Sequence, residues 1–144
     1  MTSSTTQSTQ FIEDYLHALS GQPKTDELIA QFVSDPILVE HIRNVEAAFP
    51  AYELIAHQLI AEENLVAMRG TFRGVHRGAF AGIEPTRKTV SADLMIFYRL
   101  RDGRIAEHWL QMNMGGLMDQ LTHGTDLPQD VHLPTQASSL VEAS

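Results

Sequence analysis

The sequence predicts one α+β domain, with helices first and an antiparallel sheet after them. Before Pro50, three stretches carry apolar residues at helical spacing, and after Pro50 four stretches read as strands. The polar turn signals "AEEN" and "RDGR" join two pairs of these strands closely, which favours antiparallel neighbours. Such a sheet must bury one of its faces on the helices.

The ends of the first two helices are marked by capping residues and by glycine and proline. The first helix is expected to begin at a cap on Ser8 or Thr9 and to stop before Gly21-Gln22-Pro23. The second helix is expected to be capped by Thr25, with two acidic residues in its first turn, and to end near Ser34.

The third helix is expected to begin where Asp35 precedes Pro36. An aspartate cap followed by a first-turn proline is a favoured start for a helix. His41 falls on the same stripe as the apolar residues of this helix, up to Phe49, so we expect its ring to face the core.

The four strands are expected over residues 52–60, 65–76, 89–101 and 104–113. Between the second and the third strand, the segment "GVHRGAFAGIEPTRK" has three glycines and a proline, so it is expected to be a long loop.

Alternation along the strands divides the sheet into two faces, because residues i and i+2 share a face. One set is apolar apart from a tyrosine and a histidine, so we assign it to the inner face. Its members are Val66, Met68, Gly70, Phe72, Leu94, Ile96, Tyr98, Leu100, Ala106, His108, Leu110 and Met112.

The outer face mixes pairable charges with Met95, Phe97 and Trp109. Such a mixture suits a second sheet, so we predict a homodimer through this outer face. The alternative is a solvated face with a few exposed aromatic residues.

Composition excludes several classes of function. The chain has no cysteine, which removes disulfides, thiolate nucleophiles and cysteine-based metal sites. Its net charge of −8 and scattered basic residues argue against nucleic-acid binding, and no apolar run is long enough to span a membrane. The polar start has no apolar signal region, so we expect a cytoplasmic protein with a disordered lead over 1–10, a domain over 11–122 and a tail over 123–144.

The stretch from Phe49 to Leu121 resembles the SnoaL-like polyketide cyclase and ester cyclase family, and the likeness extends back to about residue 11. The resemblance rests on the ordered motifs "GVHRGAFAGIEPT", "DGRIAEHW" and a closing "QL". It implies a cone-shaped, cystatin-like α+β barrel, in which a curved antiparallel sheet wraps around three helices. This barrel is shared with ketosteroid isomerase and the nuclear transport factor. Some relatives close a polyketide ring by aldol condensation without a metal or organic cofactor.

The sequence departs from the family pattern at three positions. Leu110 follows the HW pair where cyclases commonly carry an acid/base aspartate, and Asn113 occupies the position of a second frequent aspartate. Arg87 replaces the usual glycine after the Pro-Thr pair.

Three residues are predicted to carry the chemistry. His108 faces inward among apolar neighbours, where burial keeps an imidazole neutral near pH 7 and able to accept a proton. His41 is the second candidate base, and Tyr15 resembles the helix-one tyrosine that donates a hydrogen bond in ketosteroid isomerase. The alternatives are a core histidine bonded to backbone or water and a tyrosine that only packs.

The remaining predicted site residues bind the substrate. His76 is predicted to order the loop or to line the cavity mouth, and no metal site is predicted because no ligand spacing matches a known motif. His17 and His57 are predicted to be surface or structural residues. The apolar wall of the cavity is predicted to include Met68, Ile96, Leu110 and Met112.

These predictions lead to two functions. The first is a cofactor-free enzyme that removes a proton next to the carbonyl of a small apolar compound, for cyclisation, isomerisation or dehydration. The second is a small-molecule-binding protein of the same fold, which the leucine and asparagine at the aspartate positions favour. A dimeric scaffold with a filled core is a third possibility.

Overall fold

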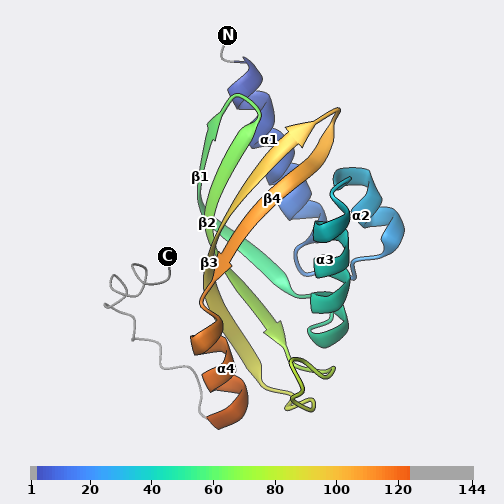
Figure 1. Ribbon diagram of the computed structural model, residues 1–144, viewed down its shortest axis with the longest axis vertical. Coiled ribbons are helices and arrows are strands. Elements are labelled where there is room, and N and C mark those ends of the chain that lie inside the picture. Colours follow the sequence, from blue (N-terminus) through green and yellow to red (C-terminus); the bar gives the residue numbers. More distant parts are fainter. Residues whose placement is uncertain (1–2, 124–144) are drawn as a thin grey trace.

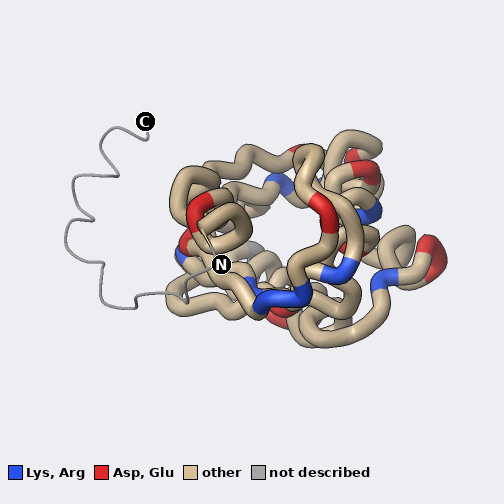
Figure 2. Tube along the Cα trace, turned by 90° about the horizontal axis from the view of Figure 1, so that it is seen from below, with Lys and Arg blue, Asp and Glu red and all other residues tan. Residues whose placement is uncertain are grey.

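The computed structural model describes residues 3–123, which form four helices and one antiparallel sheet. The sheet order is β1-β2-β3-β4, and the sheet curves around the helices (Figure 1). In the view from below, strands and helices together form a ring (Figure 2). The elements are α1 (Ser3–Leu19), α2 (Asp26–Phe32), α3 (Pro36–Ala48), β1 (Glu53–Glu62), β2 (Leu65–Val75), β3 (Thr89–Arg101), β4 (Arg104–Met112) and α4 (Met114–His123). The predicted α+β class is confirmed.

The helix starts are capped largely as predicted, with one correction at the N-terminus. The side chain of Thr25 accepts a hydrogen bond from Leu28 N at 3.1 Å, which caps α2. Helix α1, however, begins at Ser3, so the predicted disordered lead is wrong from that residue onward. The added turns pack on the β1–β2 turn, where the Ser8 hydroxyl donates to the carbonyl oxygen of Glu63.

The two faces of the sheet are those that alternation predicted. On the inner face Met68 and Tyr98 are buried, whereas on the outer face Phe97 and Trp109 are 45% and 50% exposed. At one position the predicted face assignment is wrong, because the register shifts where β3 pairs with β4. The shift turns Ile105 into the core in place of the predicted Ala106, because the extra residue reverses the alternation there.

Helix α4 was not predicted from the sequence. It packs beside β3 beyond the end of β4, where the Gln120 side-chain amide accepts from Ser91 N at 2.9 Å and donates to Ser91 O at 2.8 Å. One side chain thereby replaces the missing strand partner of β3. The predicted tail lies outside the described residues except for His123, the last residue of α4. None of the described helices is long and apolar enough to cross a membrane.

Candidate active site

The strongest chemical pair in the structure joins the start of α3 to the middle of β4. The Nδ1 atom of His108 lies 2.8 Å from Oδ2 of Asp35, and the two side chains are only 11% and 8% exposed. The other carboxylate oxygen of Asp35 accepts from the backbone N–H groups of Ile37 at 2.9 Å and Leu38 at 3.3 Å. Asp35 therefore caps α3 and holds His108 with the same carboxylate.

Backbone contacts fix this pair. The N–H groups of Ser34 and Asp35 both donate to the carbonyl oxygen of Ile105, at 2.9 and 3.1 Å. Val33 forms a parallel bridge with Ile105, so the segment between α2 and α3 runs along β4 like a short fifth strand. The carboxylate and the imidazole are thus attached to neighbouring backbone segments rather than to mobile loops.

The pair defines which nitrogen of His108 is basic. An ionised carboxylate only accepts hydrogen bonds, so Nδ1 of the neutral ring must carry the proton that bonds to Asp35. The lone pair then lies on Nε2, and the carboxylate would stabilise the imidazolium that forms when Nε2 takes a proton. The contact therefore fixes the orientation of the ring and leaves Nε2 as the nitrogen that can accept a proton.

His41 lies half-buried on α3 and interacts electrostatically with His108. Burial lowers the pKa of His41, and a positive charge on His108 lowers it further. The lowered pKa keeps the His41 ring neutral at neutral pH, and a neutral imidazole can both donate and accept a hydrogen bond. The structure thus brings together the two predicted bases and adds an aspartate that sequence reasoning had assigned only to a helix cap.

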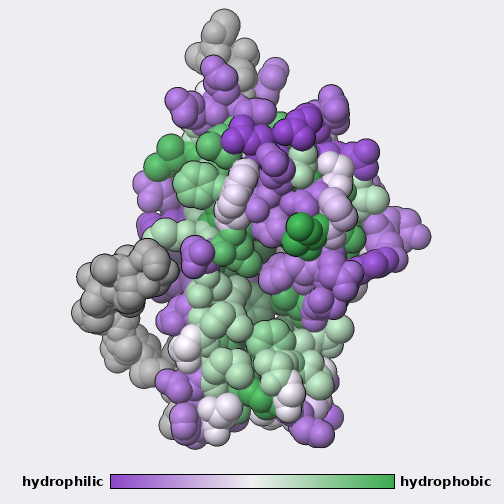
Figure 3. Space-filling model, viewed as in Figure 1, coloured by the Kyte–Doolittle hydropathy of each residue, from purple (hydrophilic) through white to green (hydrophobic). Residues whose placement is uncertain are grey.

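The surroundings of His108 are apolar. Leu110 and Met112 follow on the inner face of β4 and are half-buried, as the predicted wall requires. Figure 3 shows hydrophobic surface over much of the lower half of the molecule in this view, whereas the upper half is mainly polar. A ligand beside His108 on the inner face of β4 would meet the uncharged side chains of Leu110 and Met112.

The predicted interior cavity is not confirmed. Met68, Ile96 and Tyr15 are packed in the core. Tyr15 borders a small cavity of about 10 Å³, which has room for roughly one water molecule. Its wall consists of Tyr15, Leu16, Leu19, Ser20, Lys24, Tyr52 and Leu54.

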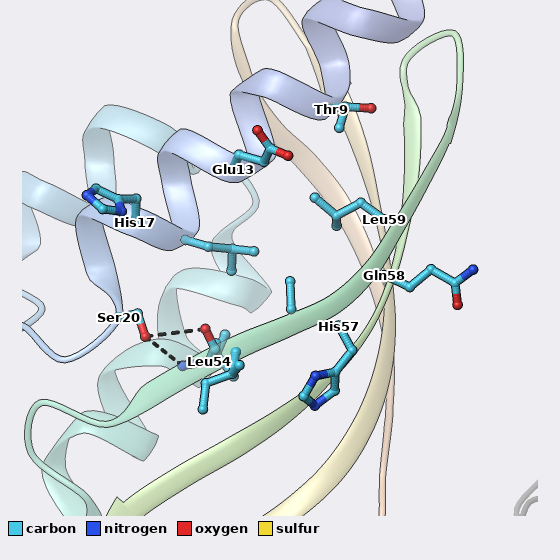
Figure 4. A pocket seen from close by; sticks show the side chains of 11 residues that line it. Thr9, Glu13, His17, Ser20, Leu54, His57, Gln58 and Leu59 are labelled. Carbon is cyan, nitrogen blue, oxygen red and sulfur yellow. Dashed lines mark hydrogen bonds between the residues drawn. The ribbon is translucent and has the colours of Figure 1, made fainter.

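A much larger groove of about 570 Å³ lies at the opposite edge of the sheet, between α1 and β1 (Figure 4). Glu13 and His17 reach it from α1 and His57 from β1, above an apolar floor. Three lining residues, Leu16, Ser20 and Leu54, also border the small interior cavity. Both histidines are exposed, as predicted, and His57 Nε2 contacts only the Thr71 hydroxyl, at 2.8 Å. This groove is much larger than the interior cavity, but the buried histidine–carboxylate pair lies at the β4 edge, and the proposed function is built on that pair.

His76 has a structural position. The ring is fully buried, and its Nδ1 accepts from Thr86 N at 3.0 Å and contacts the Thr86 hydroxyl at 3.1 Å. It also packs on the Phe49 ring, with the ring centroids 5.4 Å apart. Burial is the main reason why the pKa of His76 is lowered. Through these contacts the histidine holds the loop between β2 and β3, the first of its two predicted roles.

Potential metal ligands do not converge in the described part of the chain: no group of three His, Asp or Glu side chains is placed to hold an ion. The Asp35–His108 pair supplies two potential ligands at most, and each already has a hydrogen-bond partner there.

Comparison with known proteins gives a consistent result. The family model described as SnoaL-like polyketide cyclase matches residues 5–121. No curated protein sequence matches the chain. The solved structure of AclR, "a putative hydroxylase from Streptomyces galilaeus", is 27% identical and superposes with a TM-score of 0.70 over 97% of this chain and 94% of its own.

Two further structures share the fold. TsrD from Streptomyces laurentii is 24% identical with a TM-score of 0.65, over 79% of this chain and 93% of its own. A SnoaL-like polyketide cyclase from Agrobacterium tumefaciens is 17% identical with a TM-score of 0.65, over 79% of this chain and 97% of its own.

Proposed function

This chain belongs to the SnoaL-like polyketide cyclase family, and from that premise we propose that it is an enzyme that removes a proton next to the carbonyl of a small, largely apolar compound. The observation that carries the proposal is the Asp35–His108 pair, which leaves Nε2 as an oriented base beside an apolar surface. The family's usual aspartate is Leu110 here, and the pair supplies the base that this leucine cannot.

The proposed reaction begins when His108 Nε2 takes a proton from the carbon next to the carbonyl. The electron pair of the broken C–H bond forms the enolate, and the negative charge moves to the carbonyl oxygen. In a cyclisation the enolate carbon attacks a second carbonyl, whose oxygen then takes the proton back from His108. In this scheme Asp35 stabilises the imidazolium between these steps, and neutral His41 hydrogen-bonds the substrate.

Proton exchange tests this proposal without knowledge of the natural substrate. Apolar ketones and β-keto esters are incubated with the enzyme in D₂O, and the loss of the α-proton signal is followed by NMR. We expect His108→Ala to reduce the exchange rate by about 10²- to 10⁴-fold. His57→Ala, at the other edge of the sheet, is the matched control and should exchange like the wild type. Equal exchange by wild type and His108→Ala would refute the proposal.

The alternative is a binding protein that lacks the chemistry. It is favoured by the absence of a carboxylate at Leu110 and Asn113. Tight binding of a ligand by the wild type, with no exchange and no product, would establish it. Because AclR is named as a hydroxylase, product masses should also be searched for the gain of one oxygen atom.

We also propose a homodimer through the outer face of the sheet, and a cytoplasmic location. Met95, Phe97 and Trp109 are about half exposed there, beside an ion pair of 3.2 Å between Arg99 and Glu107. A monomeric chain rarely exposes such a group of large apolar side chains. Sedimentation equilibrium should give twice the chain mass for the wild type and the single-chain mass for Trp109→Glu. A wild-type monomer at micromolar concentration would contradict the dimer.

A further inference from the structure

Tyr98 places a hydroxyl group in the core without a hydrogen-bond partner. The residue is 0% exposed, and its hydroxyl oxygen has no partner within residues 3–123. Leaving a buried hydroxyl unpaired costs roughly 1–3 kcal/mol. The amine of Lys24 is also buried, but it has partners: it donates to the carbonyl oxygens of Gln22 at 2.7 Å and Tyr52 at 2.8 Å. An unpaired group that the fold retains at such a cost needs a reason of its own.

The position of Tyr98 relative to the active-site pair supplies that reason. In the β3–β4 ladder Tyr98 is directly opposite His108, and both side chains belong to the inner face. Side chains opposite each other in antiparallel strands have Cβ atoms about 4.5–5.5 Å apart. One small molecule can therefore contact the imidazole and the phenol together.

We propose that Tyr98 is the oxygen-binding residue of the active site: its hydroxyl donates a hydrogen bond to the carbonyl oxygen of the substrate whose proton His108 removes. The inference rests on the proposed function and extends it to a second catalytic group. As the proton leaves, negative charge accumulates on that oxygen, and a hydrogen bond from Tyr98 strengthens most in the transition state. The step is otherwise unchanged, and the tyrosine keeps its proton.

The environment of Tyr98 suits a neutral donor. Burial raises the pKa of its phenol well above the ordinary value, and the neighbouring tyrosines Tyr15 and Tyr52 raise it further. The group therefore remains an O–H donor at neutral pH. A buried, fixed donor is also more effective than one in water, because the low dielectric strengthens the contact.

Tyr98 fits this role better than Tyr15, the donor predicted from the sequence. The two rings pack edge to face, with centroids 5.7 Å apart. Tyr15 comes from α1 and borders the water-sized cavity, where a water molecule can satisfy its hydroxyl. Tyr98 lines neither this cavity nor the groove between α1 and β1, and it shares a strand pair with His108.

The ligand must displace side chains to reach Tyr98. On β4, Leu110 and Met112 next to His108 are half-buried, and Met112 is a flexible, unbranched side chain that adapts to different packing. We therefore expect entry between α3 and β4, past these two residues.

The test compares Tyr98→Phe with Tyr52→Phe, which removes a hydroxyl from the buried tyrosine that packs beside Lys24 and neighbours Tyr98. We expect Tyr98→Phe to lower α-proton exchange by about 10²- to 10³-fold. Its urea midpoint should equal or exceed that of the wild type, because an unpaired hydroxyl is removed. Tyr52→Phe should exchange within about twofold of the wild type.

A second measurement uses 4-nitrophenol, whose phenolate resembles an enolate in charge and shape. Binding is followed from its absorbance, and we expect Tyr98→Phe to weaken it about tenfold or more, against no such change in Tyr52→Phe. Full exchange by Tyr98→Phe together with loss of exchange in His108→Ala would overturn the inference and leave the proposed function intact. If even the wild type shows no exchange, unchanged nitrophenol binding by Tyr98→Phe overturns the inference separately. A large loss of stability in Tyr98→Phe would also overturn it, since the hydroxyl would then have a structural partner.

Discussion

The two edges of the sheet are closed against the helices in opposite ways. At the β4 edge, backbone hydrogen bonds from Ser34 and Asp35 to Ile105 join the strand directly to the start of α3. At the β1 edge, hydroxyls of α1 and of the turn after it make most of the contacts: Ser8 donates to the carbonyl oxygen of Glu63, and Ser20 Oγ accepts from Leu54 N at 3.0 Å. One backbone hydrogen bond, from Gly21 N to Tyr52 O at 2.9 Å, lies just before the strand. The first edge is tight and contains the oriented base. The second leaves the groove of about 570 Å³ between its contacts.

The comparison shows that the large groove and the histidine–carboxylate pair lie at different edges of the sheet. A groove shows where a molecule fits, but an acid/base step needs a titratable group held in one orientation and one protonation pattern. Only the β4 edge has both, because Asp35 is itself fixed by the N–H groups at the start of α3. The following predictions test whether the two edges differ as much as their contacts indicate.

The largest effect is expected when Asp35 is removed from the tight edge. Asp35→Ala leaves two N–H groups of α3 without their acceptor and the largely buried ring of His108 without its partner. We expect the free energy of unfolding to fall by about 2–4 kcal/mol, which a urea titration measures.

Asp35→Asn separates the two roles of this carboxylate. Asparagine caps helices nearly as well as aspartate, so the stability loss should be about 1 kcal/mol or less. The amide has no charge to stabilise the His108 imidazolium, so α-proton exchange should still fall by about tenfold or more. Equal exchange by Asp35→Asn and the wild type would show that Asp35 acts only as a cap.

The second effect concerns pH at the same edge. The pKa of His41 is lowered by burial and by the charge of His108, so the folded protein binds fewer protons than the unfolded chain below the ordinary histidine pKa of about 6.5. The stabilising contribution is complete above about pH 6.5 and is lost as the pH falls toward the folded pKa. Buried His76 acts in the same direction.

Urea titrations between about pH 5 and pH 8 check this dependence. We expect stability to fall on the acid side, and His41→Gln to reduce the slope by at most about 1.4 kcal/mol per pH unit, the limit for one proton. A slope that His41→Gln leaves unchanged would show that its ring is solvated in the folded state.

The β4 edge also shows what local sequence patterns can and cannot predict. Alternation predicted the third strand over 89–101 without error and the inward direction of His108, because side-chain direction depends only on nearby residues. The contact of His108 with Asp35 spans 73 positions, and no local pattern encodes it. A helix cap fully explained the Asp35-Pro36 pair in the sequence, so nothing in that pattern indicated a second partner for Asp35.

The differences between the predicted and the observed structure also arise from contacts between residues far apart in the sequence. Helix α4 begins with Met114-Gly115-Gly116, and two glycines are poor helix formers, so its formation depends on tertiary contacts such as that of Gln120 with Ser91. The first turns of α1 are rich in serine and threonine and pack on Glu63, which is far along the chain. The predicted interior cavity stays unconfirmed, because the space inside a fold depends on how whole side chains interlock rather than on which face they occupy.

A smaller effect is expected at the β1 edge when its hydroxyl contact is removed. Ser20→Ala deletes the acceptor of Leu54 N and the donor to Leu54 O. We expect a loss of about 0.5–1.5 kcal/mol, less than for Asp35→Ala, because water in the open groove can replace the hydroxyl. Thermal unfolding of both variants under one condition gives the comparison. A larger loss for Ser20→Ala would reverse the order of the two edges.

The smallest effect is expected when the groove itself is blocked. Glu13 faces the groove from α1, and a tryptophan at this position would occupy much of the space between α1 and β1 (Figure 4). Exposed substitutions of this kind usually change stability by no more than about 0.5 kcal/mol. Since the substrate is expected to enter between α3 and β4, Glu13→Trp should leave α-proton exchange and nitrophenol binding within about twofold of the wild type. Glu13→Gln, which removes the charge and keeps the size, is the matched control. If Glu13→Trp abolishes binding while Glu13→Gln does not, the ligand lies in the groove. The groove is separated from the interior cavity by only one layer of side chains, Leu16, Ser20 and Leu54. That result would contradict the conclusion that the large groove and the acid/base site lie at different edges.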